Sequence, residues 1–187
     1  MNPETAIFAG GCFWCIEVAF EKTSGVIAAV NGYIGGKIPD PTYEQVSTGM
    51  TGHREAVEVT YDPGKISYAQ LLEIFWQHID PTDPGGQFAD RGSQYTTAIY
   101  YLNDNQRQGA EASKAELDAC GKFDAPVATE ILPATKFYPA EDYHQDYALK
   151  NAAHYEAYNR GSGRAGYIEK TWAQVPAVCP VRPRPPR

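Results

Sequence analysis

The sequence contains few basic residues and no long apolar segment. Its 187 residues carry a net charge of −7. A nucleic-acid-binding surface needs clustered Lys and Arg, and the one such cluster, residues 181–187, is Pro-rich and typical of a polyproline-like tail. No apolar run approaches the roughly 18 residues of a membrane span, and residues 1–5 lack the basic start of a signal peptide. We therefore expect a cytoplasmic protein that binds neither nucleic acid nor a membrane.

Cysteine is scarce as well, with four residues in the chain. That number is too small for a disulfide scaffold, and in a reducing compartment a thiol is more often catalytic or inert than structural. Cys12 and Cys15 lie in the stretch GGCFWC, residues 10–15. A zinc site needs about four ligands, and the sequence has neither a second Cys-x-x-Cys pair nor a close Cys/His pair. We therefore expect no metal at this motif.

Hydrophobic periodicity predicts strands that alternate with helices. The predicted strands are residues 5–9, 26–34, 54–62 and 95–102, and the helices between them are residues 12–22 and 67–79. Their order, β-α-β-β-α-β, is that of a ferredoxin-like unit. A helix, a strand and further helices are appended, at residues 104–120, 128–132 and 140–159. We expect one α+β domain over residues 1–174, followed by a Pro/Arg-rich tail at residues 175–187.

Cys12 follows the glycine pair and opens the predicted helix at residues 12–22. The unpaired N–H groups and the dipole of a helix N-terminus favour an anion, and the thiolate is the nucleophilic form of cysteine. Cys15 lies one turn further, with its Cα roughly 5–5.5 Å from that of Cys12, within the range of a disulfide. The motif can therefore provide a nucleophile and a second thiol that forms a disulfide with it.

Three classes of protein use a cysteine in this way. A papain-like hydrolase has its histidine about 130–150 residues downstream, and His144 lies 144 − 12 = 132 positions after Cys12. The chain lacks that family's Cys-Gly-Ser/Ala-Cys pattern, however. A non-catalytic redox sensor would form a reversible disulfide without turnover. The third class is a thiol reductase that acts on an oxidised substrate.

The GCFW stretch, residues 11–14, resembles the active-site signature of the peptide methionine sulfoxide reductase A family. Further segments resemble the same family in its order: residues 41–46, 52–59, 90–95 and 137–147. The similarity covers roughly residues 5–172, and several motifs in order are more specific than one alone. It implies reduction of the S epimer of methionine sulfoxide, protein-bound or free, to methionine.

The resemblance implies that Cys12 attacks the sulfoxide sulfur and becomes a sulfenic acid. Oxygen leaves poorly as an anion, and Glu55 matches the family's proton donor. From the sequence alone, Glu55 would be interpreted as a solvated carboxylate at a strand end. Our hypothesis is that Glu55 is partly buried among Tyr43, Tyr95 and Trp14, which would raise its pKa enough to keep it protonated.

The resemblance also implies the residues that bind the substrate. Tyr43 and Tyr95 match the phenols that hold the sulfoxide oxygen, and Asp90 matches a carboxylate that helps to bind substrate or an ordered water. Phe13 and Trp14 would form the walls of the methyl pocket. Core packing is the usual role of such aromatic residues when no family is considered.

The sequence departs from the family pattern at the resolving cysteine. Many members carry glycine where Cys15 stands and use cysteines on a Gly-rich C-terminal segment. The segment around Cys179 lacks that glycine-rich context. We expect Cys15 to resolve the Cys12 sulfenic acid, with Cys179 as the alternative. A thioredoxin, which has a low reduction potential, would reduce the disulfide. The family implies no metal or organic cofactor, and we expect a monomer.

Overall fold

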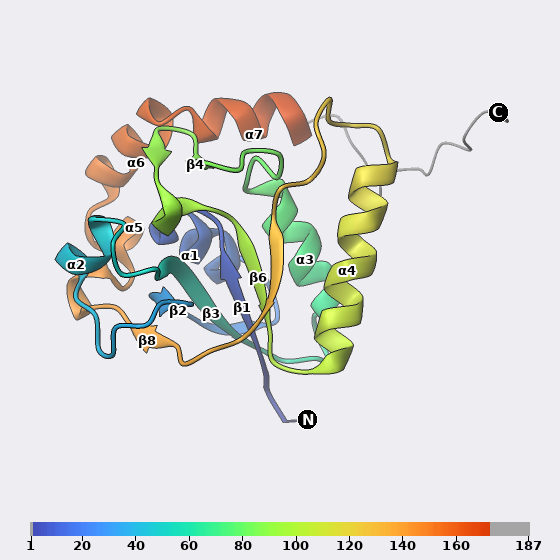
Figure 1. Ribbon diagram of the computed structural model, residues 1–187, viewed down its shortest axis with the longest axis horizontal. Coiled ribbons are helices and arrows are strands. Elements are labelled where there is room, and N and C mark those ends of the chain that lie inside the picture. Colours follow the sequence, from blue (N-terminus) through green and yellow to red (C-terminus); the bar gives the residue numbers. More distant parts are fainter. Residues whose placement is uncertain (1, 173–187) are drawn as a thin grey trace, which may run out of the picture.

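A six-stranded sheet runs through the computed structural model, which describes residues 2–172 of the chain (Figure 1). Its strands are β1 (Glu4–Ala9), β2 (Val26–Ile34), β3 (Arg54–Tyr61), β6 (Ala98–Tyr101), β7 (Glu130–Pro133) and β8 (Tyr138–Pro139). They lie in the order β7-β6-β1-β3-β2-β8. A separate two-stranded ribbon pairs β4 (Gly86–Gln87) with β5 (Asp90–Arg91).

Four neighbouring strands of the sheet, β6-β1-β3-β2, pair antiparallel throughout. Helix α1 (Phe13–Glu21) connects β1 to β2, and α3 (Tyr68–Gln77) lies on the connection from β3 to β6. This strand order and these connections form a β-α-β-β-α-β unit. The predicted α+β class and its ferredoxin-like core are therefore confirmed.

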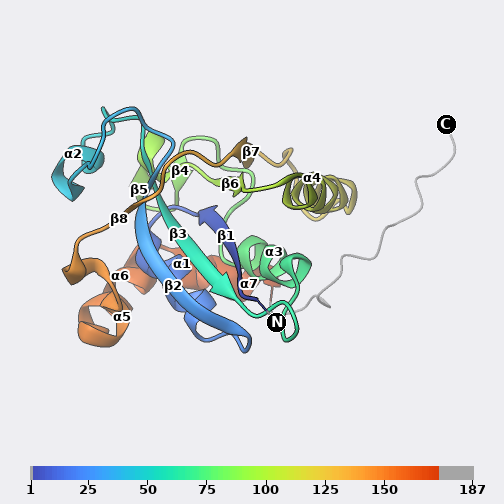
Figure 2. The same cartoon turned by 90° about the horizontal axis from the view of Figure 1, so that it is seen from below.

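Helices α1 and α3 lie on one face of the sheet, and α4 (Asp104–Ala119) lies beyond α3 (Figure 2). Helices α1 and α3 cover this face because their apolar residues recur at helical spacing and pack against the apolar side chains of the strands. Phe8 of β1 stacks on Phe20 of α1 and on Phe75 of α3, with ring centroids 5.0 and 5.1 Å apart. These buried rings hold α1, and the GGCFWC motif at its start, against the centre of the sheet.

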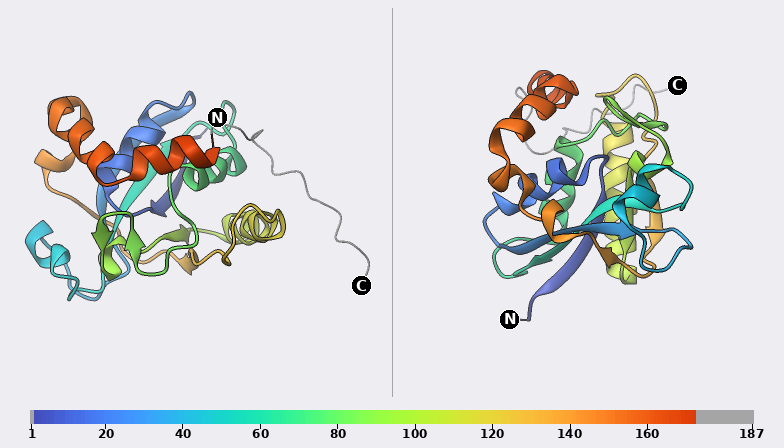
Figure 3. Two further views of the ribbon diagram at one scale, coloured as in Figure 1. Left: turned by 90° about the horizontal axis from the view of Figure 1, so that it is seen from above. Right: turned by 90° about the vertical axis from the view of Figure 1, so that its left-hand side faces the viewer.

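The C-terminal elements return to α1 from the far edge of the sheet. After β7 the chain crosses the second face of the sheet and reaches β8 at the opposite edge (Figure 1). The last helices then lie over α1 (Figure 3). The elements of this region are η2 (Asp142–His144), α5 (Tyr147–Lys150), α6 (Ala152–Gly161) and α7 (Arg164–Trp172). Helices from the end of the described chain are thus placed beside its first helix.

Most predicted elements match the structure, and the main difference concerns Tyr95. The sequence predicts a strand over residues 95–102, but β6 is shorter and Tyr95 ends a 3₁₀ turn, η1 (Ser93–Tyr95). Gly92 has φ +123°, a conformation that glycine adopts readily, so the chain turns before the strand begins. The short helix α2 (Tyr43–Ser47) was not predicted either.

The predicted division into a domain over residues 1–174 and a tail over residues 175–187 stays a prediction, because the tail lies outside the described residues. Cys179 lies there too. No helix within residues 2–172 combines the length and the apolar character that crossing a membrane requires.

The glycine pair between β1 and α1 allows a turn that a larger residue would disturb. Gly11 has φ +81°. A Cβ atom there would lie 2.5 Å from Cβ of Gln87 and 2.8 Å from Nη2 of Arg164. The turn that leads into Cys12 is therefore packed on two sides and needs glycine for both space and backbone conformation.

We expect Gly11→Ala to lower the free energy of unfolding by about 2 kcal/mol, because the substitution adds backbone strain and a steric overlap. Gly166→Ala is the matched control, since a Cβ atom at this position in α7 meets nothing within 4 Å. Alanine there should be neutral or stabilising by about 0.5–1 kcal/mol. Urea unfolding monitored by tryptophan fluorescence measures both values, and equal effects would contradict the role assigned to Gly11.

Candidate active site

Cys12 lies at the start of α1, as its N-cap residue, with a side chain that is 6% exposed. A cavity of about 60 Å³ opens beside it. The residues that line this cavity are Cys12, Phe13, Trp14, Tyr43, Glu55, Asp90, Tyr95 and Tyr158. The structure therefore brings together every residue that the sequence selected for catalysis or substrate binding, and adds Tyr158.

The cavity forms where the ends of several elements meet. Glu55 lies near the start of β3 and Tyr43 is the first residue of α2. Asp90 belongs to β5, and Tyr95 closes the turn η1 that follows it. The capping box of Thr42 fixes the start of α2, because its side chain accepts from the Gln45 N–H and its own N–H donates to the Gln45 side chain.

Glu55 is a buried carboxyl group, 2% exposed, on the same face of β3 as Val57 and Val59. Its Oε2 atom accepts a hydrogen bond of 3.0 Å from the Phe13 N–H, the first of α1. Burial raises the pKa of Glu55 to about 8, against the lowering effect of this hydrogen bond, and nearby Asp90 raises it further. At neutral pH the carboxyl is therefore protonated and has a proton to donate.

The two thiols differ in acidity. Burial raises the pKa of Cys12 well above its usual value, and the neighbouring Cys15 and Glu55 add to this effect. The helix N-terminus alone would have lowered that pKa, but the loss of solvent outweighs it. For Cys15, the hydrogen bond from the Cys12 thiol lowers the pKa to about 7, and the positive charge of Arg164 contributes. The first proton to leave this pair therefore comes from Cys15.

Tyr43 and Tyr95 present phenol groups to the cavity. Burial raises the pKa of Tyr43 to about 12, and burial likewise raises the pKa of Tyr95, so both remain protonated at neutral pH. Within residues 2–172, neither hydroxyl has a hydrogen-bond partner. Both hydroxyls are therefore available to donate to an oxygen atom of a bound molecule.

Tyr158 reaches the cavity from α6 and was missed by the sequence analysis. Its hydroxyl donates to Oδ2 of Asp90, and burial together with the nearby Cys12 and Asp90 raises its pKa. The predicted helical region at residues 140–159 is rich in tyrosine, which is the one signal the sequence offers for it. Periodicity does not distinguish which of those phenols faces the cavity.

Trp14 is held by two residues from the C-terminal half of the chain. Its Nε1–H donates to Nδ1 of His144 at 3.2 Å, and its ring stacks on Tyr147 with centroids 3.8 Å apart and planes 6° from parallel. His144 does not line the cavity beside Cys12. The Cys12–His144 pair that a papain-like hydrolase would need is therefore not formed.

One acidic cluster among the described residues has a geometry that could hold a cation. Oxygens of Glu17, Glu21 and Asp146 lie within 4.8 Å of one another. Lys150 already pairs with Asp146 at 3.3 Å, and Glu17 accepts from the Asp146 N–H at 2.9 Å. Neither thiol belongs to this cluster, so it supplies no metal to the cavity at Cys12.

Glu55→Gln should change how stability depends on pH. In the folded protein the Glu55 pKa is about 8 against an ordinary value of 4.5, so the folded state retains a proton that the unfolded state loses. The stability of the unsubstituted protein relative to Glu55→Gln should therefore fall as pH rises from about 5 to 8, by on the order of 3 kcal/mol. Denaturant unfolding at several pH values measures this difference. Glu44→Gln, at an exposed position, is the control and should not show this pH dependence. If the stability of Glu55→Gln changed with pH in the same way as that of the unsubstituted protein, the burial argument would be contradicted.

Comparison with known proteins identifies the family. The model of the peptide methionine sulfoxide reductase family matches residues 4–176. A peptide methionine sulfoxide reductase MsrA from Bacillus pumilus is 56% identical over 172 residues, which cover 92% of this chain and 97% of that protein. The protein of the same name from Bacillus subtilis is 55% identical over 171 residues, which cover 91% and 97%.

Solved structures agree with this assignment. Methionine sulfoxide reductase A of Corynebacterium diphtheriae superposes with a TM-score of 0.72 and 38% identity, over 80% of this chain and 76% of that chain. Mxr1 from Saccharomyces cerevisiae in its reduced form gives a TM-score of 0.76 and 30% identity, over 81% and 87%. Sequence, fold and the thiol cavity lead to one conclusion: this chain belongs to the peptide methionine sulfoxide reductase A family and is a thiol-dependent methionine sulfoxide reductase.

Proposed function

We propose that this chain reduces the S epimer of methionine sulfoxide, protein-bound or free, through a sulfenic acid at Cys12 that Cys15 resolves. The observation that carries the proposal is the pairing of a buried, protonated carboxyl with a thiol at one small cavity. Glu55 has the proton that a departing oxygen needs, and Cys12 has the nucleophilic sulfur.

The first half-reaction moves one oxygen atom from the substrate to Cys12. The hydroxyls of Tyr43 and Tyr95 hold the sulfoxide oxygen, and Glu55 donates its proton to that oxygen. Cys12 attacks the substrate sulfur, and the thiol proton it loses restores the Glu55 carboxyl. The attack forms a bond between the two sulfurs. The hydroxyl then passes from the substrate sulfur to the Cys12 sulfur as the sulfur–sulfur bond breaks, so that methionine leaves and Cys12 is left as a sulfenic acid.

Epimer selection follows from three fixed points around the sulfoxide sulfur. Phe13 and Trp14 provide an apolar wall for the methyl group, Tyr43 and Tyr95 hold the oxygen, and Cys12 attacks from its own position in the cavity lining. With those positions fixed, only one epimer directs the rest of the methionine chain out of the cavity. Family membership indicates the S epimer.

The second half-reaction regenerates the two thiols. Cys15 attacks the Cys12 sulfenic acid, water leaves, and a disulfide forms. We propose thioredoxin as the reductant, since its low potential suits this step, and since Mxr1 has been solved in complex with Trx2. The steps need thiols and a carboxyl group and no prosthetic group. We propose that the chain acts in the cytoplasm, as a monomer.

An epimer assay tests the reaction. With racemic N-acetyl-methionine sulfoxide and dithiothreitol, we expect the S epimer alone to disappear on a chiral column, and Cys12→Ser to abolish the loss. Glu55→Gln should slow the oxidation of Cys12 by about 10²–10⁴-fold, the usual contribution of a positioned proton donor. Glu58→Gln, three residues further along β3 and on the other face, is the matched control and should keep the rate. Loss of the R epimer, or a full rate in Glu55→Gln, would refute the proposal.

Peptide mapping after one turnover without reductant identifies the resolving cysteine. Cys12 and Cys15 lie on one tryptic peptide, residues 1–22, so their disulfide appears as an internal bridge in that peptide. We expect this product in the unsubstituted protein and in Cys179→Ser, and a sulfenic acid that dimedone can trap in Cys15→Ser. A dominant bridge between Cys12 and Cys179 would assign the role to Cys179 instead.

A further inference from the structure

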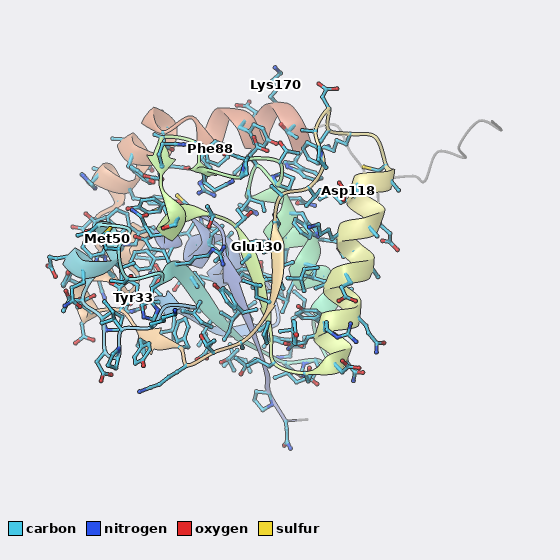
Figure 4. All side chains as sticks on the ribbon, viewed as in Figure 1. Tyr33, Met50, Phe88, Asp118, Glu130 and Lys170 are labelled. Carbon is cyan, nitrogen blue, oxygen red and sulfur yellow. The ribbon has the colours of Figure 1, made fainter. Side chains whose placement is uncertain are left out.

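Arg164, the first residue of α7, is a buried cation: it is 2% exposed. Its Nη1 donates to the His78 carbonyl and its Nη2 to the Gly10 carbonyl at 2.9 Å. The guanidinium lies 4.8 Å from the ring centroid of Phe88, which is labelled in Figure 4. No carboxylate within residues 2–172 lies within 4.0 Å of it. Burying a charge without an opposite charge beside it is unfavourable, so a negative charge near this guanidinium is favoured.

The guanidinium lies directly behind the active-site turn. Nη2 would be 2.8 Å from a Cβ atom at Gly11, the residue before Cys12. Arg164 and Cys15 line one cavity of about 720 Å³ between α1 and the C-terminal helices. Cys12 lines the small substrate cavity and not this one, whereas Cys15 lines this one and not the substrate cavity. The cation is therefore on the side of α1 where the second thiol is exposed to a cavity.

Several charged or titratable groups surround Cys15, and they differ in the charge they can provide. Those that influence it directly or line its cavity are Cys12, Lys22, Glu55, His78, Asp90, Tyr155, Glu156, Arg160, Arg164 and Glu169. Glu55 keeps its proton at neutral pH, and the raised pKa of Cys12 keeps that thiol neutral. Tyr155, whose pKa burial raises, also stays neutral. Glu156 and Glu169 are exposed carboxylates of the cavity, and neither they nor Asp90 form an ion pair with Arg164 within residues 2–172. Cys15 is therefore the buried group of this cavity whose negative charge Arg164 can balance.

We propose that Arg164 is a positioning residue for the resolving step, in which its guanidinium is the counter-ion of the Cys15 thiolate. The proposal rests on the role proposed above for Cys15. The thiolate attacks the sulfur of the Cys12 sulfenic acid: the sulfur–sulfur bond forms, the sulfur–oxygen bond breaks, and the hydroxide that leaves takes up a proton to give water. The lowered pKa of Cys15 agrees with this role, and the hydrogen bonds of Arg164 keep its charge fixed beside the turn that carries Cys12.

A single-turnover experiment separates the two halves of the reaction. Reduced protein is mixed with one equivalent of methionine sulfoxide without reductant, and released methionine is counted. Disulfide formation is followed by rapid acid quench, alkylation and mass spectrometry between pH 5.5 and 9. In the unsubstituted protein the rate of disulfide formation should rise with pH, with a midpoint set by the ionisation of Cys15, because the thiolate is the attacking form.

Arg164→Gln should raise that midpoint by about one pH unit or more, since removing an opposite charge disfavours the thiolate. Disulfide formation at pH 6.5 should then slow by about tenfold, while one methionine per protein is still released. Arg164→Lys keeps the charge and should restore most of the midpoint. Arg160→Gln removes an exposed cation from the same cavity and should leave the midpoint unchanged.

Each outcome supports or overturns the proposal. An equal slowing of Arg164→Gln at every pH, with an unchanged midpoint, would assign Arg164 a structural role and overturn it. If Arg164→Gln fails to fold, a raised midpoint in Arg164→Lys would overturn it as well. Absence of methionine release from the unsubstituted protein would instead refute the proposed function, so the two failures are distinguishable.

Discussion

The hydrogen bond from the Phe13 N–H to the Glu55 carboxyl connects the sheet to the chemistry. It joins β3 to the first turn of α1 and so fixes the position of Cys12 relative to Glu55, the proposed proton donor. The Phe13 N–H belongs to the N-terminus of α1, so this hydrogen bond occupies a donor that could otherwise stabilise a thiolate at Cys12. Burial disfavours charge on Glu55 more than the hydrogen bond favours it, so the carboxyl stays neutral in the resting site. A neutral acid beside a neutral thiol allows two reactive groups to share a site with little solvent.

Burial also separates the tasks of the two cysteines. Cys12 is next to Glu55, and burial, with Cys15 and Glu55 nearby, raises its pKa, so it is a thiol in the resting site. Cys15, one turn along α1, faces Arg164 and a larger cavity, and its lowered pKa makes it the acidic member of the pair. The sequence of the motif does not distinguish the two cysteines. The fold does, because the elements packed around Cys12 and around Cys15 carry different charges.

The sequence could predict the core because strand and helix periodicity is local. It could also predict the burial of Glu55: the alternation that predicts β3 places Glu55 on the face of Val57 and Val59, which the structure buries. The interpretation of Glu55 as solvated is therefore wrong. Tyr158 could not be selected, because its role depends on which side of α6 packs against the cavity, and several tyrosines in that region have equivalent patterns. The turn at Tyr95 likewise depends on the conformation of Gly92. The residues after Gly92 are β-prone, so the sequence pattern predicts a strand there and not a turn.

Arg164 is the clearest example of a residue near the site that could be identified from the structure but not from the sequence. Nothing near it in the sequence indicates burial, since α7 is polar on most of its surface and Arg is usually exposed. It is buried because α7 crosses the start of α1, where the Gly10 and His78 carbonyls require donors that no strand or helix provides. Satisfying those carbonyls with a guanidinium also places a positive charge beside Cys15. Cys15 stands one turn along α1 from Cys12, and the packing of the last described helix supplies a positive charge on its side of α1.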